Sequence, residues 1–134
     1  MIELHPITLE GRTVRLVPME ESHAHELAEV ALEPQIWQHM VYGNVDSEEK
    51  LRGVLRLLLK RQAQGTDLCF TALHRETNKP IGCTRYMNIA VADRGLEIGG
   101  TFYGLAYQRT GVNTECKYLL LRHAFEVWGC IRAQ

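Results

Sequence analysis

The segment 96–115 constrains the fold of this chain more than any other, because three kinds of structure follow one another in it. Residues 96–103 are typical of a strand, a glycine-containing loop comes next, and a helix is expected to begin at Thr114. The first turn of a helix has unpaired N–H groups and a partial positive charge, so a phosphate placed there gains several hydrogen bonds. Gly111 would let an anion approach the backbone, and Arg109 would add a cation. The segment therefore predicts an anion-binding turn, although an ordinary strand-to-helix connection has the same spacing.

Two better-known phosphate loops do not match this segment. No Gly-Lys-Ser/Thr run follows the loop, as a P-loop would require. The second and third glycines of a dinucleotide-binding fingerprint are also missing. The function of the loop must therefore be inferred from the sequence around it.

The rest of the chain predicts a mainly antiparallel sheet flanked by helices. Strands are expected over 13–17, 68–74, 81–89 and 96–103, and the last three follow one another through short turns, as in an antiparallel meander. Helices are expected over 20–32, from Pro34 onward, over 48–64 behind a Ser47 cap, and over 114–128 with a stop at Gly129. The fold class that follows is α/β (α+β).

Two of these helices have a clear apolar face. In the helix over 48–64 the inward residues are Leu51, Val54, Leu55, Leu58 and Leu59, and in the helix over 114–128 they are Leu120, Ala124, Phe125 and Trp128. The other side of the first helix carries Arg52, Arg56 and Lys60 at fourfold spacing. Such a basic stripe is either a solvated face or an anion-binding surface.

Composition excludes several classes of function. The 134 residues suggest one domain, residues 1–134, and the 15 basic and 16 acidic side chains leave a net charge of −1, which favours neither nucleic acid nor a charged membrane as a partner. No apolar run approaches the roughly 18 residues of a membrane span, and the N-terminus lacks a signal-peptide pattern. We therefore expect a cytoplasmic protein.

Neither the cysteines nor the histidines predict a metal site. Cys69, Cys83, Cys116 and Cys130 stand far apart in apolar contexts, which favours buried free thiols over disulfides or metal ligands. His23 and His25 are two residues apart on a predicted helix, so they point to different faces. No metal is expected.

At the glycine loop the sequence resembles a known family. Gln108-Arg109-Thr110-Gly111-Val112-Asn113 resembles the Gln/Arg-x-x-Gly-x-Gly/Ala loop of the GNAT acyltransferase superfamily. The Glu97-Ile98-Gly99 strand, the helix-to-strand run from Thr114 to Arg132, and the opening Leu9 to Pro18 resemble its RimJ/RimL-like branch of ribosomal-protein N-terminal acetyltransferases. The resemblance covers nearly the whole chain and implies a GNAT-like fold.

The resemblance implies acetyl-coenzyme A as the cosubstrate. The loop from Gln108, with the backbone amides of Arg109, Thr110, Gly111, Val112 and Asn113 and the Thr114 hydroxyl, would hold the pyrophosphate. The backbone of Phe102 and Tyr103 would pair with the pantetheine arm. Asn113 departs from the family's Gly or Ala, and we expect it to cap the helix.

The implied reaction is acetylation of a primary amine, on a protein N-terminus or a small molecule, by direct attack. Glu97 is the candidate general base, or else a structural carboxylate paired with Arg85 or Arg94. Tyr103 is a candidate proton donor, as is Tyr107, although aromatic residues beside a loop also serve packing. Trp37, His39 and Tyr42 line the acceptor site or belong to the core.

Residues 130–134 have the pattern of an opening strand, and there the sequence stops. Members of the resembled family continue with further strands and a helix, so we expect a truncated domain that holds the cofactor loop but not the whole pocket. The alternative to an active enzyme is a non-catalytic fragment that binds coenzyme A or dimerises. An exposed sheet edge would favour a homodimer, through dimerisation or strand exchange with a second copy.

Overall fold

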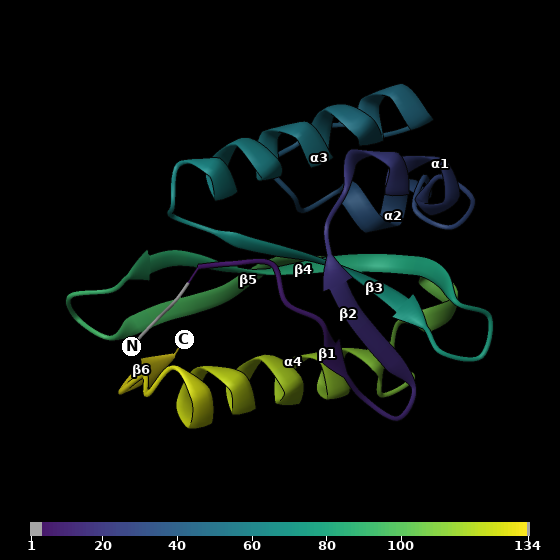
Figure 1. Ribbon diagram of the computed structural model, residues 1–134. Coiled ribbons are helices and arrows are strands. Elements are labelled where there is room, and N and C mark those ends of the chain that lie inside the picture. The colour runs from purple at the N-terminus through teal and green to yellow at the C-terminus, as the bar shows by residue number, and fades with distance from the viewer. Residues whose placement is uncertain (1–3, 134) are drawn as a thin grey trace.

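The computed structural model describes residues 4–133, in which one six-stranded sheet forms the centre of the molecule (Figure 1). The strands lie side by side in chain order: β1 (Leu9–Glu10), β2 (Val14–Pro18), β3 (Leu68–His74), β4 (Lys79–Ala90), β5 (Gly95–Tyr103) and β6 (Arg132–Ala133). Neighbouring strands are antiparallel except for β5 and β6, which are parallel. The mixed, mainly antiparallel sheet predicted from the sequence is confirmed. Of the strand expected at 130–134, residue 134 lies outside the described residues.

Helices cover both faces of the sheet (Figure 1). One face carries the 3₁₀ turn η1 (Glu21–His23), α1 (Ala24–Leu27), α2 (Pro34–Trp37) and α3 (Glu48–Ala63). The other face carries α4 (Val112–Arg122), which follows the 3₁₀ turn η2 (Leu105–Tyr107) and continues into the π-helical turn η3 (His123–Val127). The loop that begins α4 is thereby brought to the end of β5.

Alternating strand residues fill two separate apolar layers. Phe70 and Tyr86 pack with Leu120 and Trp128 on the α4 side. Strand residues of the other parity face the opposite side. The buried residues there include Cys69, Cys83 and Phe102 from the strands and Leu27, Leu51 and Leu55 from the helices. This period of two is what a sheet covered on both faces requires.

The start of α3 agrees with the sequence prediction. Ser47 is the N-cap residue, and its hydroxyl accepts a hydrogen bond from the Lys50 backbone N–H at 3.2 Å. Leu51, Val54, Leu55 and Leu58 are buried, whereas Leu59 is only partly so. The capped, amphipathic helix is confirmed.

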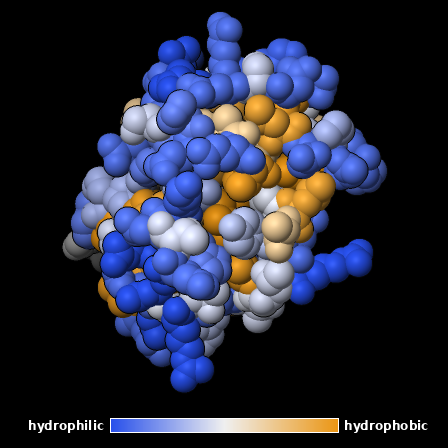
Figure 2. Space-filling view, turned by 90° about the vertical axis from the view of Figure 1, so that its right-hand side faces the viewer, coloured by the Kyte–Doolittle hydropathy of each residue, from blue (hydrophilic) through white to orange (hydrophobic). Residues whose placement is uncertain are grey.

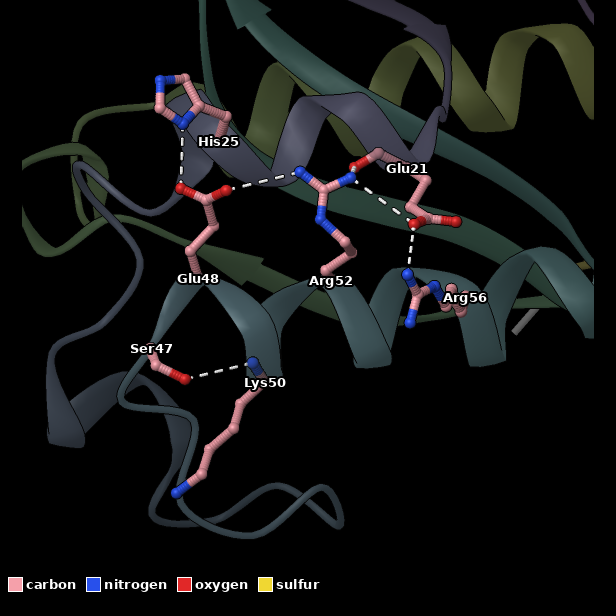
Figure 3. A network of polar contacts seen from close by, with 7 residues as sticks. All are labelled: Glu21, His25, Ser47, Glu48, Lys50, Arg52 and Arg56. Carbon is pink, nitrogen blue, oxygen red and sulfur yellow. Dashed lines mark hydrogen bonds and ion pairs between the residues drawn. The ribbon is translucent and has the colours of Figure 1, made fainter.

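Two arginines of the basic stripe on α3 are held by carboxylates (Figure 3). Glu21 pairs with Arg56 at 2.8 Å and with Arg52 at 3.5 Å. Glu48 pairs with Arg52 at 3.4 Å and also accepts a hydrogen bond from His25. The Arg56 guanidinium lowers the pKa of Glu21. These ion pairs favour the solvated-face interpretation of the stripe over anion binding.

Two helix predictions are wrong in detail. The helix expected over 20–32 ends at Leu27, and the Ala31 carbonyl instead accepts a hydrogen bond from the Trp37 indole at 2.7 Å. Phe125, expected inside, has 46% of its surface exposed. The π-helical turn widens the helix there, so Ala124 and Trp128 stay buried while Phe125 lies off the apolar face.

The surface carries both hydrophobic and hydrophilic residues. Figure 2 shows the face at the right of Figure 1, where an area of hydrophobic residues reaches the surface and is bordered by hydrophilic ones. Some hydrophobic residues are therefore exposed on this face.

Candidate functional site

Strand β5 has a bulge and an open outer edge. Cys83 of β4 pairs with Phe102, but Arg85 pairs with Gly99, so β5 carries one extra residue between these two pairs. On its other side, β6 reaches only Gly95 and Leu96. Within the part of the chain that the structure describes, the outer edge of β5 is unpaired over 97–103. An edge without a neighbouring strand can pair with another extended chain.

Glycine is required at the bulge for two reasons. Gly100 has a φ of 59°, in the left-handed region that side chains rarely adopt. A β-carbon at Gly100 would also collide with the Arg85 guanidinium. Beside it, the hydroxyls of Thr84 and Thr101 lie 2.8 Å apart and join the bulge to β4. The bulge is thus fixed from both strands.

The loop between β5 and α4 leaves the start of the helix open. Gly111 is the N-cap residue with a φ of 88°, and no side chain caps this helix end among the described residues. The N–H groups of the first helical residues are therefore free to bind an acceptor. Asn113, expected to be the cap, is the second residue of the helix because α4 begins two residues earlier than predicted.

Hydrogen bonds hold this loop in place. The Gln108 side chain donates to the Tyr103 carbonyl at 3.2 Å, and the Thr110 hydroxyl donates to the Tyr107 carbonyl at 2.6 Å. In the first turn of α4, the Glu115 carboxylate accepts from the backbone N–H groups of Thr13 and Val14, both at 2.9 Å. This last contact fastens the helix start to β2.

The open edge and the open helix start meet in one cleft of about 480 Å³. Its lining residues are Ile36, Met40, Ile98, Gly99, Thr101, Phe102, Tyr103, Gln108, Arg109, Asn113 and Lys117. Five predicted residues are among them: Phe102, Tyr103, Gln108, Arg109 and Asn113. The predicted Glu97, Thr110, Gly111, Val112 and Thr114 do not line it, although the last four lie in the adjoining loop and helix start.

Several cleft residues were not predicted from the sequence. Lys117 follows Asn113 by four residues, and that spacing places both on one face of a helix, so it could have been found. Ile36 and Met40 come from the segment around α2, far from β5 in the sequence, and carry no such signal. Arg109 and Lys117 are cations beside a helix start, which makes this end of the cleft suited to an anion.

Glu97 lies outside the cleft. Its carboxylate accepts a hydrogen bond from the Asn88 side chain at 2.6 Å. The ion pair considered with Arg85 does not form, because Arg85 pairs with Asp67 instead. The role of Glu97 as a base stays a prediction.

The Tyr103 side chain is buried in the core, although the residue lines the cleft. It is buried on the α4 side beside Cys116, and burial raises the pKa of its hydroxyl. A raised pKa makes the phenol a weaker acid, and its role as a proton donor stays a prediction. Burial likewise raises the pKa of the Cys116 thiol to about 11.

The four thiols are expected to resist alkylation in the folded protein. All are free and buried, as predicted, and burial raises the pKa of Cys69 to about 12. With a pKa near that of Cys116, only about one thiol in a thousand is ionised at pH 8, and the thiolate is the reactive form. Mass spectrometry after iodoacetamide treatment should show no adduct before denaturation and four adducts after it. Rapid single labelling of the folded chain would contradict the buried assignment.

His23 and His25 make side-chain contacts within the folded chain. His23 lies 2.7 Å from the Thr71 hydroxyl, and burial lowers its pKa, whereas His25 contacts Glu48. Among residues 4–133, no group of three or more His, Cys, Asp or Glu side chains is placed to hold a metal. In the same residues no helix has both the length and the apolar character to cross a bilayer.

Comparison with known proteins gives a family match and several structural matches. The family model described as an acetyltransferase (GNAT) domain matches residues 13–133. A protein from T. thermophilus, provisionally assigned as an acetyltransferase, superposes with a TM-score of 0.84 at 28% identity, covering 98% of this chain and 67% of that one. A GCN5-related N-acetyltransferase from Brucella melitensis gives 0.80 at 25% identity, covering 92% and 57%.

A more distant match shares the fold alone. RimL, a ribosomal-protein alpha-N-acetyltransferase solved in complex with coenzyme A, has a TM-score of 0.75 at 19% identity, covering 93% of this chain and 71% of its own. Another matched acetyltransferase structure is covered over 65% of its length, so this chain spans between 57% and 71% of the length of these matched structures. No curated protein sequence matches.

Proposed function

This chain belongs to the GNAT acetyltransferase family, and on that premise we propose that it transfers an acetyl group from acetyl-coenzyme A to a primary amine. The observation that carries the proposal is the cleft, in which the open, bulged edge of β5 meets the uncapped start of α4. A protein N-terminus is favoured over a small amine as the acceptor, because RimL has the same fold and modifies such a group.

The helix start and the two cations support binding of the cosubstrate's pyrophosphate. The N–H groups of Val112, Asn113 and Thr114 have no capping side chain, and Arg109 and Lys117 line the cleft beside them. The outer edge of β5 at Phe102 and Tyr103 has no neighbouring strand within the described residues, so it is suited to the amide groups of the pantetheine arm, which would add to β5 as a strand does. The pyrophosphate and the pantetheine arm of the cosubstrate thus each have suitable groups in the cleft.

The transfer needs no protein nucleophile. A neutral amine attacks the thioester carbonyl, the carbon–sulfur bond breaks, and the proton lost by the nitrogen balances the proton gained by the thiolate. Backbone N–H groups of β5 are the donors available for the oxyanion that forms on attack. Glu97 and Tyr103 remain the proposed base and acid, although Glu97 would have to act from outside the cleft.

A second candidate function is coenzyme A binding without turnover. The specific observation in its favour is that the Tyr103 hydroxyl is buried beside Cys116 in the apolar layer on the α4 side. The cofactor loop does not depend on that hydroxyl, so binding could persist where proton transfer fails.

Thermal unfolding and a thiol-release assay separate these functions. Coenzyme A at a hundred times its Kd is expected to stabilise the fold by about 2.7 kcal/mol. Thiol release from acetyl-coenzyme A, measured with a panel of peptide N-termini and small amines, is expected above the rate without amine. Stabilisation without amine-dependent release would support the binding fragment, and the absence of any shift with coenzyme A would contradict both proposals.

A further inference from the structure

We infer that Arg85 is a positioning residue that sets the width of the cleft by contacting both of its walls. One wall is the bulged backbone of β5, and the other is the segment containing Met40. The inference rests on the proposed function, because it assigns the Met40 wall to the amine acceptor. Its physical basis is a chain of contacts that begins inside the sheet.

Arg85 is a buried cation with a buried partner. Its side chain is 5% exposed, and its Nε lies 2.9 Å from Oδ2 of Asp67, whose side chain is 4% exposed. Asp67 immediately precedes β3, and Arg85 lies opposite Cys69 in the ladder between β3 and β4. A buried ion pair of this kind contributes little net stability compared with apolar residues of the same volume. Stability alone therefore does not explain the pair.

One of the two remaining nitrogens of Arg85, Nη1, contacts both sides. Nη1 donates a hydrogen bond to the Tyr42 hydroxyl at 3.0 Å. The same nitrogen lies against Gly100, at the place where a β-carbon would be. One guanidinium, oriented by Asp67, thus touches both the bulge of β5 and the loop that follows α2.

Tyr42 links Arg85 to the apolar wall of the cleft through its ring contacts. Its ring packs edge-on against Trp37 at 6.1 Å, and Trp37 packs against Phe102 at 4.7 Å. Met40 lies between Trp37 and Tyr42 in the chain and lines the cleft, as does Ile36 one residue before Trp37. A Tyr42 hydroxyl held in place therefore also holds Ile36 and Met40, the wall opposite Gly99 and Thr101.

The test replaces Tyr42 with phenylalanine, which removes the hydroxyl and keeps the ring on Trp37. The matched control is Tyr86→Phe, which removes a buried hydroxyl that donates to the Leu120 carbonyl on the α4 side, outside the cleft. Tyr42→Phe is expected to raise KM for the amine about five- to tenfold while coenzyme A affinity stays within about twofold. Amide hydrogen exchange over residues 38–46 should become faster in Tyr42→Phe and stay unchanged in Tyr86→Phe.

Amide hydrogen exchange and the amine KM together test the inference separately from the proposed function. Unchanged exchange over 38–46, or an unchanged amine KM in an active Tyr42→Phe variant, would overturn the role of Arg85. Equal effects of both tyrosine variants on KM would also overturn it, since a general loss of stability would then be sufficient. If the unchanged chain transfers no acetyl group, the proposed function and the acceptor assignment fail, and the exchange experiment decides whether Arg85 holds the wall.

Discussion

Replacing Asp67 with alanine is expected to lower the free energy of unfolding by about 3–5 kcal/mol, because it leaves the buried Arg85 guanidinium without its counter-charge. The Arg85 side chain enters the apolar layer beneath α2 and α3, where water cannot replace the carboxylate. Chemical denaturation measures the change in the free energy of unfolding. An equal slope of that free energy against denaturant concentration in both proteins would show that the substitution changed stability and not the surface exposed on unfolding.

A double variant separates the loss of the pair from the loss of Asp67 itself. In Asp67→Ala/Arg85→Met no charge remains buried, and the methionine fills much of the arginine's volume. Such replacements are often neutral or stabilising, so the double variant is expected to recover most of the lost stability. Two results would contradict a buried Arg85–Asp67 ion pair. One is a loss of unfolding free energy below about 1 kcal/mol in Asp67→Ala, as for an exposed pair, and the other is a double variant no more stable than the single one.

Local patterns in the sequence predicted most of the elements. The Ser47 cap, the apolar face of α3 and the three-strand meander depend on neighbours within a few residues, and each was confirmed. The glycine loop before α4 was recognised for the same reason. Its boundary was missed by two residues because Gly111, rather than Asn113, adopts the N-cap position.

The features that shape the cleft were not predictable in this way. The bonds from the Thr13 and Val14 N–H groups to Glu115 join residues about a hundred positions apart, and the Arg85–Asp67 pair joins β4 to the residue that precedes β3. The bulge in β5 depends on the register with β4, which no alternation in a single strand specifies. Such contacts exist only after the sheet has assembled, so a pattern read along the chain cannot contain them.

Replacing Gly111 with valine is expected to weaken coenzyme A binding by about a hundredfold or more, a loss of about 2.8 kcal/mol. At a φ of 88°, a β-branched residue is strained, and relief of that strain would turn the N–H groups at the start of α4 away from the anion they are proposed to bind. The added side chain would also occupy the open space in front of the loop. Isothermal titration with coenzyme A measures the change.

Gly65→Val is the matched control for this experiment. Gly65 follows α3, has a φ of 85° and likewise has no atom near the position of a β-carbon, so it carries the same backbone strain far from the cleft. Both variants should lose similar stability, but only Gly111→Val should lose coenzyme A. A third variant, Gly111→Asn, keeps a residue that tolerates the left-handed conformation and tests the side chain without the strain. Equal coenzyme A affinity in the Gly111 and Gly65 variants would place the pyrophosphate elsewhere, since backbone strain would be matched and only the loop would differ.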